Sequence, residues 1–522
     1  MSESKENNNL ENNNKRKRDL NDEEYKESLN ITSINEINSI PSSIISLFIT
    51  QDGTRTGPPI EIPLTSTTKQ LDVLINTLLE NNEPLPYAFY LNNTEITTSI
   101  EDTIKLLNEN NENNISYEEA LTISYQPLSV YRVRPVTRCI ESMPGHTDAV
   151  IIVSFSPNGQ RLASGGGDAA VRFWNTTTSM PTHTCLGHRN HILCALWTPD
   201  GNKFISADRN GEIRVWDPEN RASLKHTLIG HKKWVTSLAC EPYHADPACR
   251  RIASGSKDNT IRIWNIDNGR CETVISGHSD SVESVKWGGN GLIYSCSRDR
   301  TIMVWEIDGH GRSAQKLIRT LTGHAHRINT LALSCDYALR TGWYQLGVRY
   351  TSDNEPSPEE KQQIALTKYQ QTLDSDGEKL VSGSDDFTLF LWKPSQSNKP
   401  VTRMTGHQQL VNHILFSPDG RYIASASFDK KIKLWCGKTG KFLATCSSHV
   451  NSVYQVAWSS DSYYLVSASK DSTIKIWNVK DPKKPLNTLS GHADEVYTID
   501  WNPNGTQVAS GSKDHLIKIW HH

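Results

Sequence analysis

The chain has 522 residues and a net charge of −3, with 36% hydrophobic and 22% charged residues. This length accommodates two or three domains or one large repeat array. A dedicated nucleic-acid-binding protein usually carries a strongly basic domain, and a membrane-spanning helix needs about 18 apolar residues in a row. The sequence has neither feature, so both classes are disfavoured and any contact with RNA or DNA is expected to come from local patches.

Ten cysteines are scattered through strand-like segments and form no CxxC pair. Reduced, buried thiols of a nuclear or cytosolic protein are therefore the expected state. A zinc site needs clustered ligands, so we expect no metal ion or cofactor that belongs to this chain alone.

Residues 1–42 are rich in Asn and nearly free of aromatic residues. Such a segment buries too little apolar surface to offset its conformational entropy, so a disordered tail is predicted. The run Lys15-Arg16-Lys17-Arg18 is typical of a nuclear import signal and equally of solvated charge in a tail. Both interpretations stay open.

Periodicity predicts a small α+β domain over residues 43–128. Alternating apolar residues indicate strands, and spacings of three and four indicate a helix with Thr67 or Thr68 at its N-cap. The expected strands cover 43–51, 60–64, 87–91 and 121–125, with the helix over 67–79. The order ββαββ suits a ubiquitin-like, β-grasp domain.

From residue 145 onward the sequence repeats. Eight tryptophans recur, most of them 41 to 48 residues apart, which lies within the range of WD40 repeats. Each Trp has a Ser ten residues before it and a His further upstream, and seven of the eight have an Asp six residues before. The first repeat supplies this set as His146, Ser164, Asp168 and Trp174.

These four positions predict a structural network. A buried Trp needs an acceptor for its indole N–H, and a buried His and Asp need each other. A catalytic Ser-His-Asp triad occurs once per active site, whereas this set occurs eight times, which argues against an enzyme. The second repeat has Asn210 in place of the aspartate, so we expect a weaker network there.

Each repeat is expected to form a four-stranded antiparallel sheet. Eight such sheets predict an all-β, closed, eight-bladed WD40 propeller over residues 129–522. The last repeat ends at residue 520 without an outer strand, and the strand-like segment 130–136 is predicted to supply it. Closure in this way leaves no open edge in the ring.

Two insertions interrupt the repeats, at residues 241–250 and 336–376. Both are expected on the rim opposite the Gly-His loops, and the longer one contains a predicted helix over 359–373. Because long loops in compact domains are usually functional or disordered, we expect 336–376 to contact a partner.

The residue three positions after each His varies from repeat to repeat. Trp234 and Arg327 occupy this position in the third and fifth repeats, and both residue types are favoured at interfaces, so they are candidate partner-binding residues. Ordinary surface variability explains the column equally well. Basic pairs such as Lys232-Lys233 are either phosphate contacts or solvated surface.

Residues 45–522 resemble the Notchless family of large ribosomal subunit assembly factors. The resemblance is carried by residues 86–90 (PYAFY), 132–139 (RVRPVTRC), 336–342 (DYALRTG), 382–392 and 404–412. It implies a non-enzymatic scaffold of the nucleus and nucleolus, monomeric within its particle and without membrane contact. The propeller would dock on proteins, and in places on rRNA, of the 60S precursor.

The resemblance also implies a second partner and a site. The ubiquitin-like domain would bind the metal-ion-dependent adhesion site of the AAA ATPase midasin, whose force remodels the particle. Glu95 would give one oxygen to Mg²⁺ or a similar divalent cation held by that partner, with Ile96 and Thr97 beside it at the contact. Without the resemblance, Glu95 is one acid among 58.

A second class of function is a WD40 adaptor, either in Notch signalling or in the presentation of substrates to a ubiquitin ligase. The family name records the first of these links. Co-sedimentation with large-subunit precursors distinguishes the scaffold from the adaptor.

Overall fold

The computed structural model describes residues 42–51, 53–81, 84–109, 120–128, 133–307, 315–346, 348, 350, 355–373 and 377–522. The chain divides between Pro127 and Leu128 into two compact units, the N-terminal domain and the propeller. The predicted disordered tail, except Ser42, and its basic run lie outside the described residues. Among the helices of the described residues, none is long and apolar enough to cross a membrane.

Within its described residues, the N-terminal domain is a five-stranded sheet with two helices. Its strands are ordered β2-β1-β5-β3-β4, with β1 parallel to β5 and the other pairs antiparallel. This order confirms the predicted β-grasp fold, although the sequence predicted only four of the five strands and missed the short β4. The elements are β1 (Ser43–Ile49), β2 (Arg55–Pro63), α2 (Thr68–Leu78), β3 (Tyr87–Leu91), β4 (Thr94–Glu95), α3 (Ile100–Glu109) and β5 (Leu121–Pro127).

The helix α2 begins as the sequence predicts, and α3 was not predicted. Thr67 precedes α2, and its backbone N–H donates to the Gln70 side chain at 2.8 Å, which satisfies a donor at the helix start. The helix α3 buries Ile100, Ile104 and Leu107 in the domain core. Its apolar stripe is only three residues long, too short to stand out from the polar sequence around it.

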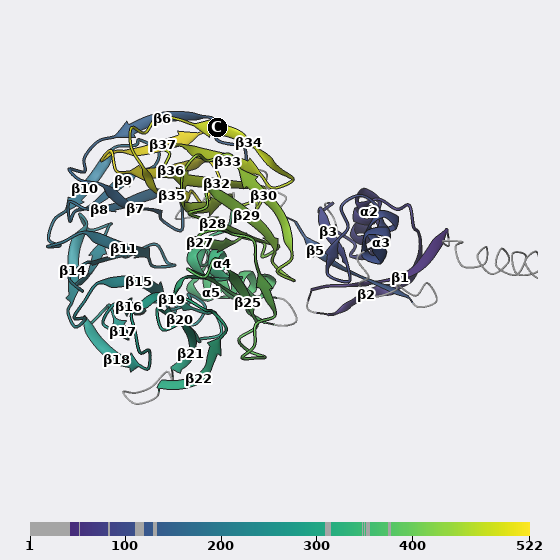
Figure 1. Cartoon of the computed structure of the whole chain (residues 1–522), viewed down its shortest axis with the longest axis horizontal. Helices are drawn as coiled ribbons and strands as arrows, with labels where there is room; N and C mark the ends of the chain where they lie inside the picture. The colour runs from purple at the N-terminus through teal and green to yellow at the C-terminus, as the bar shows by residue number, and fades with distance from the viewer. Residues whose placement is uncertain are drawn as a thin grey trace, which may run out of the picture. The chain divides into compact units, whose positions relative to one another are not determined.

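The propeller sheets surround a common centre (Figure 1). In the described part of residues 128–522 the pattern is eight four-stranded antiparallel sheets, or blades. The first four blades are β7 (Val150–Phe155), β8 (Arg161–Gly166), β9 (Val171–Asn175) and β10 (Pro181–Cys185); β11 (Ile192–Trp197), β12 (Phe204–Asp208), β13 (Ile213–Asp217) and β14 (Ser223–Leu228); β15 (Val235–Cys240), β16 (Arg251–Ser256), β17 (Thr260–Asn265) and β18 (Arg270–Ser276); and β19 (Val282–Trp287), β20 (Ile293–Ser297), β21 (Thr301–Ile307) and β22 (Gln315–Thr322).

The other four blades complete the ring, and the eighth joins the two ends of the propeller. They are β23 (Ile328–Leu333), β24 (Leu380–Ser384), β25 (Leu389–Trp392) and β26 (Thr402–Met404); β27 (Val411–Phe416), β28 (Tyr422–Ser427), β29 (Lys431–Cys436) and β30 (Phe442–Ser447); β31 (Val453–Trp458), β32 (Tyr464–Ser469), β33 (Ile474–Asn478) and β34 (Asp481–Leu489); and β35 (Val496–Trp501), β36 (Gln507–Ser512), β37 (Ile517–His521) and β6 (Arg138–Met143).

The closing strand is β6, not the predicted segment 130–136. Met143 pairs with Ile517 and Arg138 with His521 across the β37–β6 ladder. Residues 129–132 lie outside the described residues, and Val133 and Val136 pack as buried residues in the core shared with blades 7 and 8. Val133 and Val136 thus belong to a packed segment that precedes the strand. Closure itself is confirmed.

Each blade contains the predicted network. In blade 1, Trp174 Nε1 donates to Ser164 Oγ at 3.0 Å, the serine lies 2.8 Å from His146 Nε2, and His146 Nδ1 lies 2.9 Å from Asp168. Since indole is only a donor, the serine hydroxyl accepts from Trp174. The His146 ring joins this serine to the Asp168 carboxylate, and burial lowers the pKa of His146, which favours the neutral ring.

Blade 2 contradicts the expectation of a weaker network at Asn210. Asp208, two residues earlier, supplies the carboxylate, which lies 3.1 Å from His188 Nδ1. Its other oxygen accepts the backbone N–H groups of Asn210 and Glu212 at 2.9 and 3.0 Å. Asp208 is fully buried, whereas Asn210 is exposed. The charge is kept because a different residue of the same turn reaches the histidine.

The two insertions lie together and fold against the blades. The longer one forms α4 (Asp336–Thr341) and α5 (Pro358–Gln371), and Figure 1 shows both helices near the centre of the ring. The predicted helix over 359–373 is confirmed, and α4 was not predicted. Gln362 donates to the His244 carbonyl of the shorter insertion at 2.7 Å, and the His244 ring stacks on Tyr369.

The ten cysteines are free thiols. Burial raises the pKa of Cys185 and of Cys446 to about 12, which disfavours the reactive thiolate. The expectation of buried thiols holds for five of them, Cys185, Cys249, Cys296, Cys335 and Cys446, whereas Cys139 is exposed and Cys194, Cys240, Cys271 and Cys436 are partly buried.

We expect Asp208→Asn to lower the free energy of unfolding of the propeller by about 2 kcal/mol, because a buried charge-assisted hydrogen bond is lost. Asn210→Ala, at the position where the aspartate was expected, should change it by less than about 0.5 kcal/mol. Denaturant unfolding of both variants measures the difference. Equal destabilisation by the two substitutions would contradict the assignment of the charge to Asp208.

We expect the midpoint of thermal unfolding to fall as the pH is lowered from 7.5 to 5.5. Burial lowers the pKa of His146, His449 and His492, and lowers that of His413 to about 4. Below the unfolded pKa of about 6.5, the unfolded chain takes up protons that the folded chain does not, so stability is lost. A midpoint that stays constant over this range would contradict the neutral histidines.

A further loss is expected below about pH 4. Burial would raise the pKa of Asp168 and Asp258, but hydrogen bonds from histidine and backbone N–H groups outweigh it and hold both pKa values well below the usual range. The stability that these carboxylates contribute is present above the unfolded pKa and disappears as the pH falls through the folded one.

Candidate functional site

Glu95 lies on a tight hairpin at the edge of the N-terminal sheet. Strand β4 pairs only with β3 in the sheet order, with Tyr90 opposite Glu95 and Leu91 opposite Thr94. The two connecting residues, Asn92 and Asn93, have φ values of 47° and 65°. Two consecutive positive φ values are typical of a type I′ turn, which Asn tolerates better than most residues.

Both sides of Glu95 are held in place. Ile96 is 2% exposed and packs in the domain core, and its backbone N–H donates to the Phe89 carbonyl at 2.8 Å. The expectation that the Ile96 side chain contacts a partner is therefore corrected, since this side chain anchors the loop from inside. Thr97 is exposed, and Glu95 is half-buried.

The loop after Glu95 is tied to the start of α3. The hydroxyls of Thr98 and Ser99 both donate to Asp102 Oδ2 at 2.8 Å. These two hydrogen bonds lower the pKa of the Asp102 carboxyl. The hairpin on one side and α3 on the other leave Glu95 little backbone freedom, so the carboxylate is presented on a rigid support.

The chemistry available at Glu95 is that of one carboxylate. In the part of the chain that the structure describes, no group of three or more His, Cys, Asp or Glu side chains is placed to hold a metal ion. A divalent cation bound at Glu95 would take its other ligands from a second molecule. A carboxylate oxygen is a ligand that Mg²⁺ and Ca²⁺ both accept.

The two rim residues predicted to bind partners have intramolecular contacts. Trp234 is half-buried, with the Arg209 guanidinium 4.2 Å and the Lys257 ammonium 4.1 Å from its ring centroid. Arg327 forms an ion pair with Asp385 and keeps 38% of its side chain exposed. Trp234 and Arg327 belong to the propeller, whereas Glu95 belongs to the N-terminal domain.

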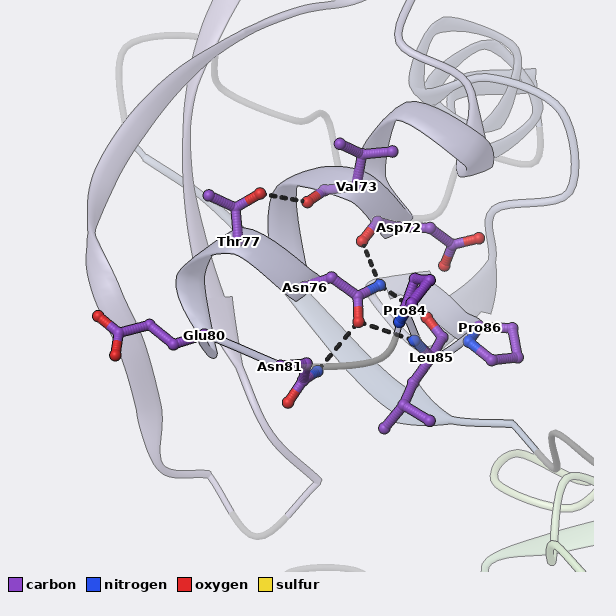
Figure 2. A pocket seen from close by; sticks show the side chains of 9 residues that line it. All are labelled: Asp72, Val73, Asn76, Thr77, Glu80, Asn81, Pro84, Leu85 and Pro86. Carbon is purple, nitrogen blue, oxygen red and sulfur yellow. Dashed lines mark hydrogen bonds between the residues drawn. The ribbon is translucent and has the colours of Figure 1, made fainter.

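A hollow of about 660 Å³ lies beside α2 in the N-terminal domain (Figure 2). Asn76 lies in its wall, and its side-chain nitrogen donates to the carbonyls of Asp72 and Leu85 at 2.8 and 2.7 Å. Its oxygen accepts the Leu85 N–H at 2.8 Å and the Asn81 side chain at 3.0 Å. These bonds fix the connection between α2 and β3.

A larger cavity, of about 1070 Å³, lies where the long insertion meets the blades. Lys368 of α5 lines it and donates to the Tyr344 carbonyl at 2.9 Å, and burial lowers its pKa to about 7. The Arg340 guanidinium of α4 crosses to Asp500 of blade 8, at 2.9 Å. Pairwise contacts of this kind were not predictable from the repeat, because they join an insertion to distant blades.

The inner face of the long insertion is thus occupied by the propeller itself. Lys286 of blade 4 pairs with Asp336 at 2.9 Å, and the Tyr344 hydroxyl donates to the Asp200 carbonyl of blade 2 at 3.1 Å. The expectation that residues 336–376 contact a partner stays a prediction, and it concerns only the outer face.

Comparison with known families identifies both units. The model of the NLE (NUC135) domain matches residues 44–104. The model of the WD domain, G-beta repeat, matches residues 137–175, 179–217, 222–265, 269–306, 369–393, 398–436, 440–478 and 483–521. Each unit of the structure therefore has its own family match.

Known proteins match most of the chain. The chain is 50% identical to Protein Notchless of Drosophila melanogaster over 386 residues, which cover 74% of this chain and 76% of that protein. It is 43% identical to Ribosome assembly protein 4 of Saccharomyces cerevisiae over 424 residues, 78% of this chain and 80% of that protein.

A solved structure supports the fold of the second unit. The C-terminal WD40 domain of Sif2 matches with a TM-score of 0.57 and 17% identity, over 74% of this chain and 98% of that one. At this identity the match bears on the fold alone. The family models and the two relatives show that the chain belongs to the Notchless family, which includes ribosome assembly protein 4.

Proposed function

We propose that this protein is a non-enzymatic scaffold in the assembly of the large ribosomal subunit, acting in the nucleus and nucleolus. The observation that carries the proposal is the 43% identity, over 80% of its length, to a protein named Ribosome assembly protein 4. The Ser, His and Asp side chains that could suggest a hydrolase support the scaffold instead, because they hydrogen-bond to one another and to a buried Trp in blade after blade.

The propeller is the part proposed to dock on the precursor particle. Its ring is closed by β6, and the long insertion is packed on one rim. A closed propeller leaves only short, protected sheet edges. Its two flat faces, whose rims carry the loops, and its outer circumference are available for contacts. Docking on such a rigid surface loses little conformational entropy in the scaffold.

The N-terminal domain is proposed to bind the metal-ion-dependent adhesion site of midasin through Glu95. The hairpin that carries Glu95 is at the edge of the sheet and is anchored by Ile96 on one side and Asp102 on the other. A pre-positioned carboxylate can complete the coordination of a cation held by the partner without a costly rearrangement. Force applied at this domain would reach the particle through the docked propeller.

We expect Glu95→Gln to weaken binding to a midasin adhesion-site domain in the presence of Mg²⁺ by on the order of 100-fold, because a neutral amide replaces the anionic ligand. The matched control is Glu80→Gln, which removes the same charge from an exposed position of the same domain. Isothermal titration with the full chain measures both, and chelation of the cation should reduce wild-type binding to the level of Glu95→Gln. Equal affinities of the two variants would contradict the metal contact.

We expect the wild-type chain and Glu95→Gln both to co-sediment with large-subunit precursors from nuclear extract. The reason is that docking is assigned to the propeller and the metal contact to the other unit. Precursors that carry the variant should accumulate, because they are bound but not remodelled. A chain that sediments apart from precursors, with a receptor or a ubiquitin ligase, would contradict the scaffold and favour the adaptor.

A further inference from the structure

The rim that carries the Gly-His loops has a regular ring of paired positions. In each blade, the residue seven positions before the network tryptophan donates its backbone N–H to the carbonyl of the residue three positions after the network histidine. This bond occurs in all eight blades, with lengths of 2.8 to 3.1 Å, and its donors are Gly167, Arg209, Lys257, Arg298, Asp385, Phe428, Lys470 and Lys513. The backbone geometry is constant, so only the side chains distinguish one part of the ring from another.

Cations dominate this ring in blades 2 to 4. Arg209, Lys257 and Arg298 occupy it consecutively, and Arg209 and Arg298 are exposed. Lys232 and Lys233, also exposed, flank Trp234 in the adjoining loop of blade 3. We call Arg209, Lys232, Lys233, Trp234, Lys257 and Arg298 the cationic sector.

Two cations of this sector, Arg209 and Lys257, are held by Trp234 without being neutralised. Trp234 lies within cation–π distance of both Arg209 and Lys257, at 4.2 and 4.1 Å. Over the described residues, the five cations of the sector form no ion pair with a carboxylate. A tryptophan orients a cation while leaving its charge uncancelled, which a carboxylate partner would not do.

The same ring positions in blades 7 and 8 show the contrast. Lys470 lies 3.5 Å from Glu495, and Lys513 lies 3.4 Å from Asp494. In blade 5 the ring position is itself an acid, Asp385, paired with Arg327. The ring therefore has a neutralised part and a part with net positive charge, although the whole chain carries −3.

Two acids, Glu283 and Asp280, lie near the sector's cations. Burial raises the pKa of Glu283 against the attraction of Lys257, Arg298 and Arg327, and the nearby Asp280 carboxylate raises it further. Glu283 is half-buried on β19 and forms no ion pair in the described part of the chain. Two carboxylates do not balance five cations.

We propose that the cationic sector binds the phosphate backbone of RNA. Lysine is depleted from protein–protein interfaces, whereas lysine and arginine make the phosphate contacts of nucleic-acid-binding proteins. Cations fixed by Trp234 need less ordering when a polyanion binds. The inference rests on the proposed function to the extent that a precursor of the large subunit supplies the RNA.

The test uses the purified full chain and a fluorescent 20-nucleotide oligo(U), with affinity measured by anisotropy from 50 to 200 mM salt. We expect Arg209→Gln/Lys257→Gln/Arg298→Gln to bind about tenfold more weakly or worse, with a log–log salt slope shallower by about 2, since each phosphate contact on a single strand contributes about 0.7. The control, Lys399→Gln/Lys483→Gln/Lys484→Gln, removes three exposed lysines elsewhere on the propeller. Its slope should change by less than half as much.

A second variant separates anchoring from charge. Trp234→Leu keeps every cation, so it should bind oligo(U) about two- to fivefold more weakly with the salt slope unchanged. Thermal unfolding midpoints of all variants check that the propeller is folded. A slope reduced by Trp234→Leu as much as by the triple variant would overturn the role given to the tryptophan.

The remaining outcomes are also decisive. Absence of oligo(U) binding, or equal losses in the sector and control variants, would overturn the proposal. Poly-glutamate that binds the sector as tightly as oligo(U) would assign it to an acidic protein segment instead, and would overturn it too. Glu95→Gln should bind oligo(U) like the wild type. If the RNA proposal is contradicted, the midasin contact and the docking on precursors are therefore still tested separately, by the titration and the co-sedimentation described above.

Discussion

The hydrogen bond between a buried histidine and a buried carboxylate is the interaction on which the propeller depends. In blade 1 it joins His146, at the end of the loop before the first strand, to Asp168 in the turn before the third. The same histidine is hydrogen-bonded to Ser164, and Ser164 accepts the indole N–H of Trp174 inside the sheet. Because every member has a partner, each blade buries four polar groups without the cost of leaving one unsatisfied.

Repetition of this network has a functional consequence. The loops and turns of one rim are fixed to the same backbone geometry in every blade, as the eight matching N–H···O=C bonds show. Side chains at those positions can then vary without altering the fold. The rim therefore differs in charge from blade to blade while its backbone geometry stays the same. Blades 2 to 4 carry cations without a carboxylate partner, whereas the lysines of blades 7 and 8 are paired with acidic side chains.

The two proposed functions, docking on the precursor and binding to the partner's cation, suit the different structures of the two units. The propeller is a large rigid body with a packed insertion on one rim and a charged sector on the other. The N-terminal domain is small, and its proposed site is a single carboxylate on an edge hairpin. Such a contact is specific because a cation demands a charged oxygen at a defined position, and it can be broken without disturbing the scaffold.

Local pattern by itself determined the repeat number, the residue types of the network and the β-grasp order, because periodicity and a recurring set of donors and acceptors are visible along one chain. The tertiary structure decided what depends on neighbours distant in sequence. It placed the closing strand at Arg138–Met143, which pairs with β37. It also gave Asp208 the role expected at Asn210, because the Asp208 carboxylate lies within hydrogen-bond distance of His188 although it is not at the aligned position of the repeat. It also turned Ile96 into the core, and it set Trp234 between two cations from neighbouring blades.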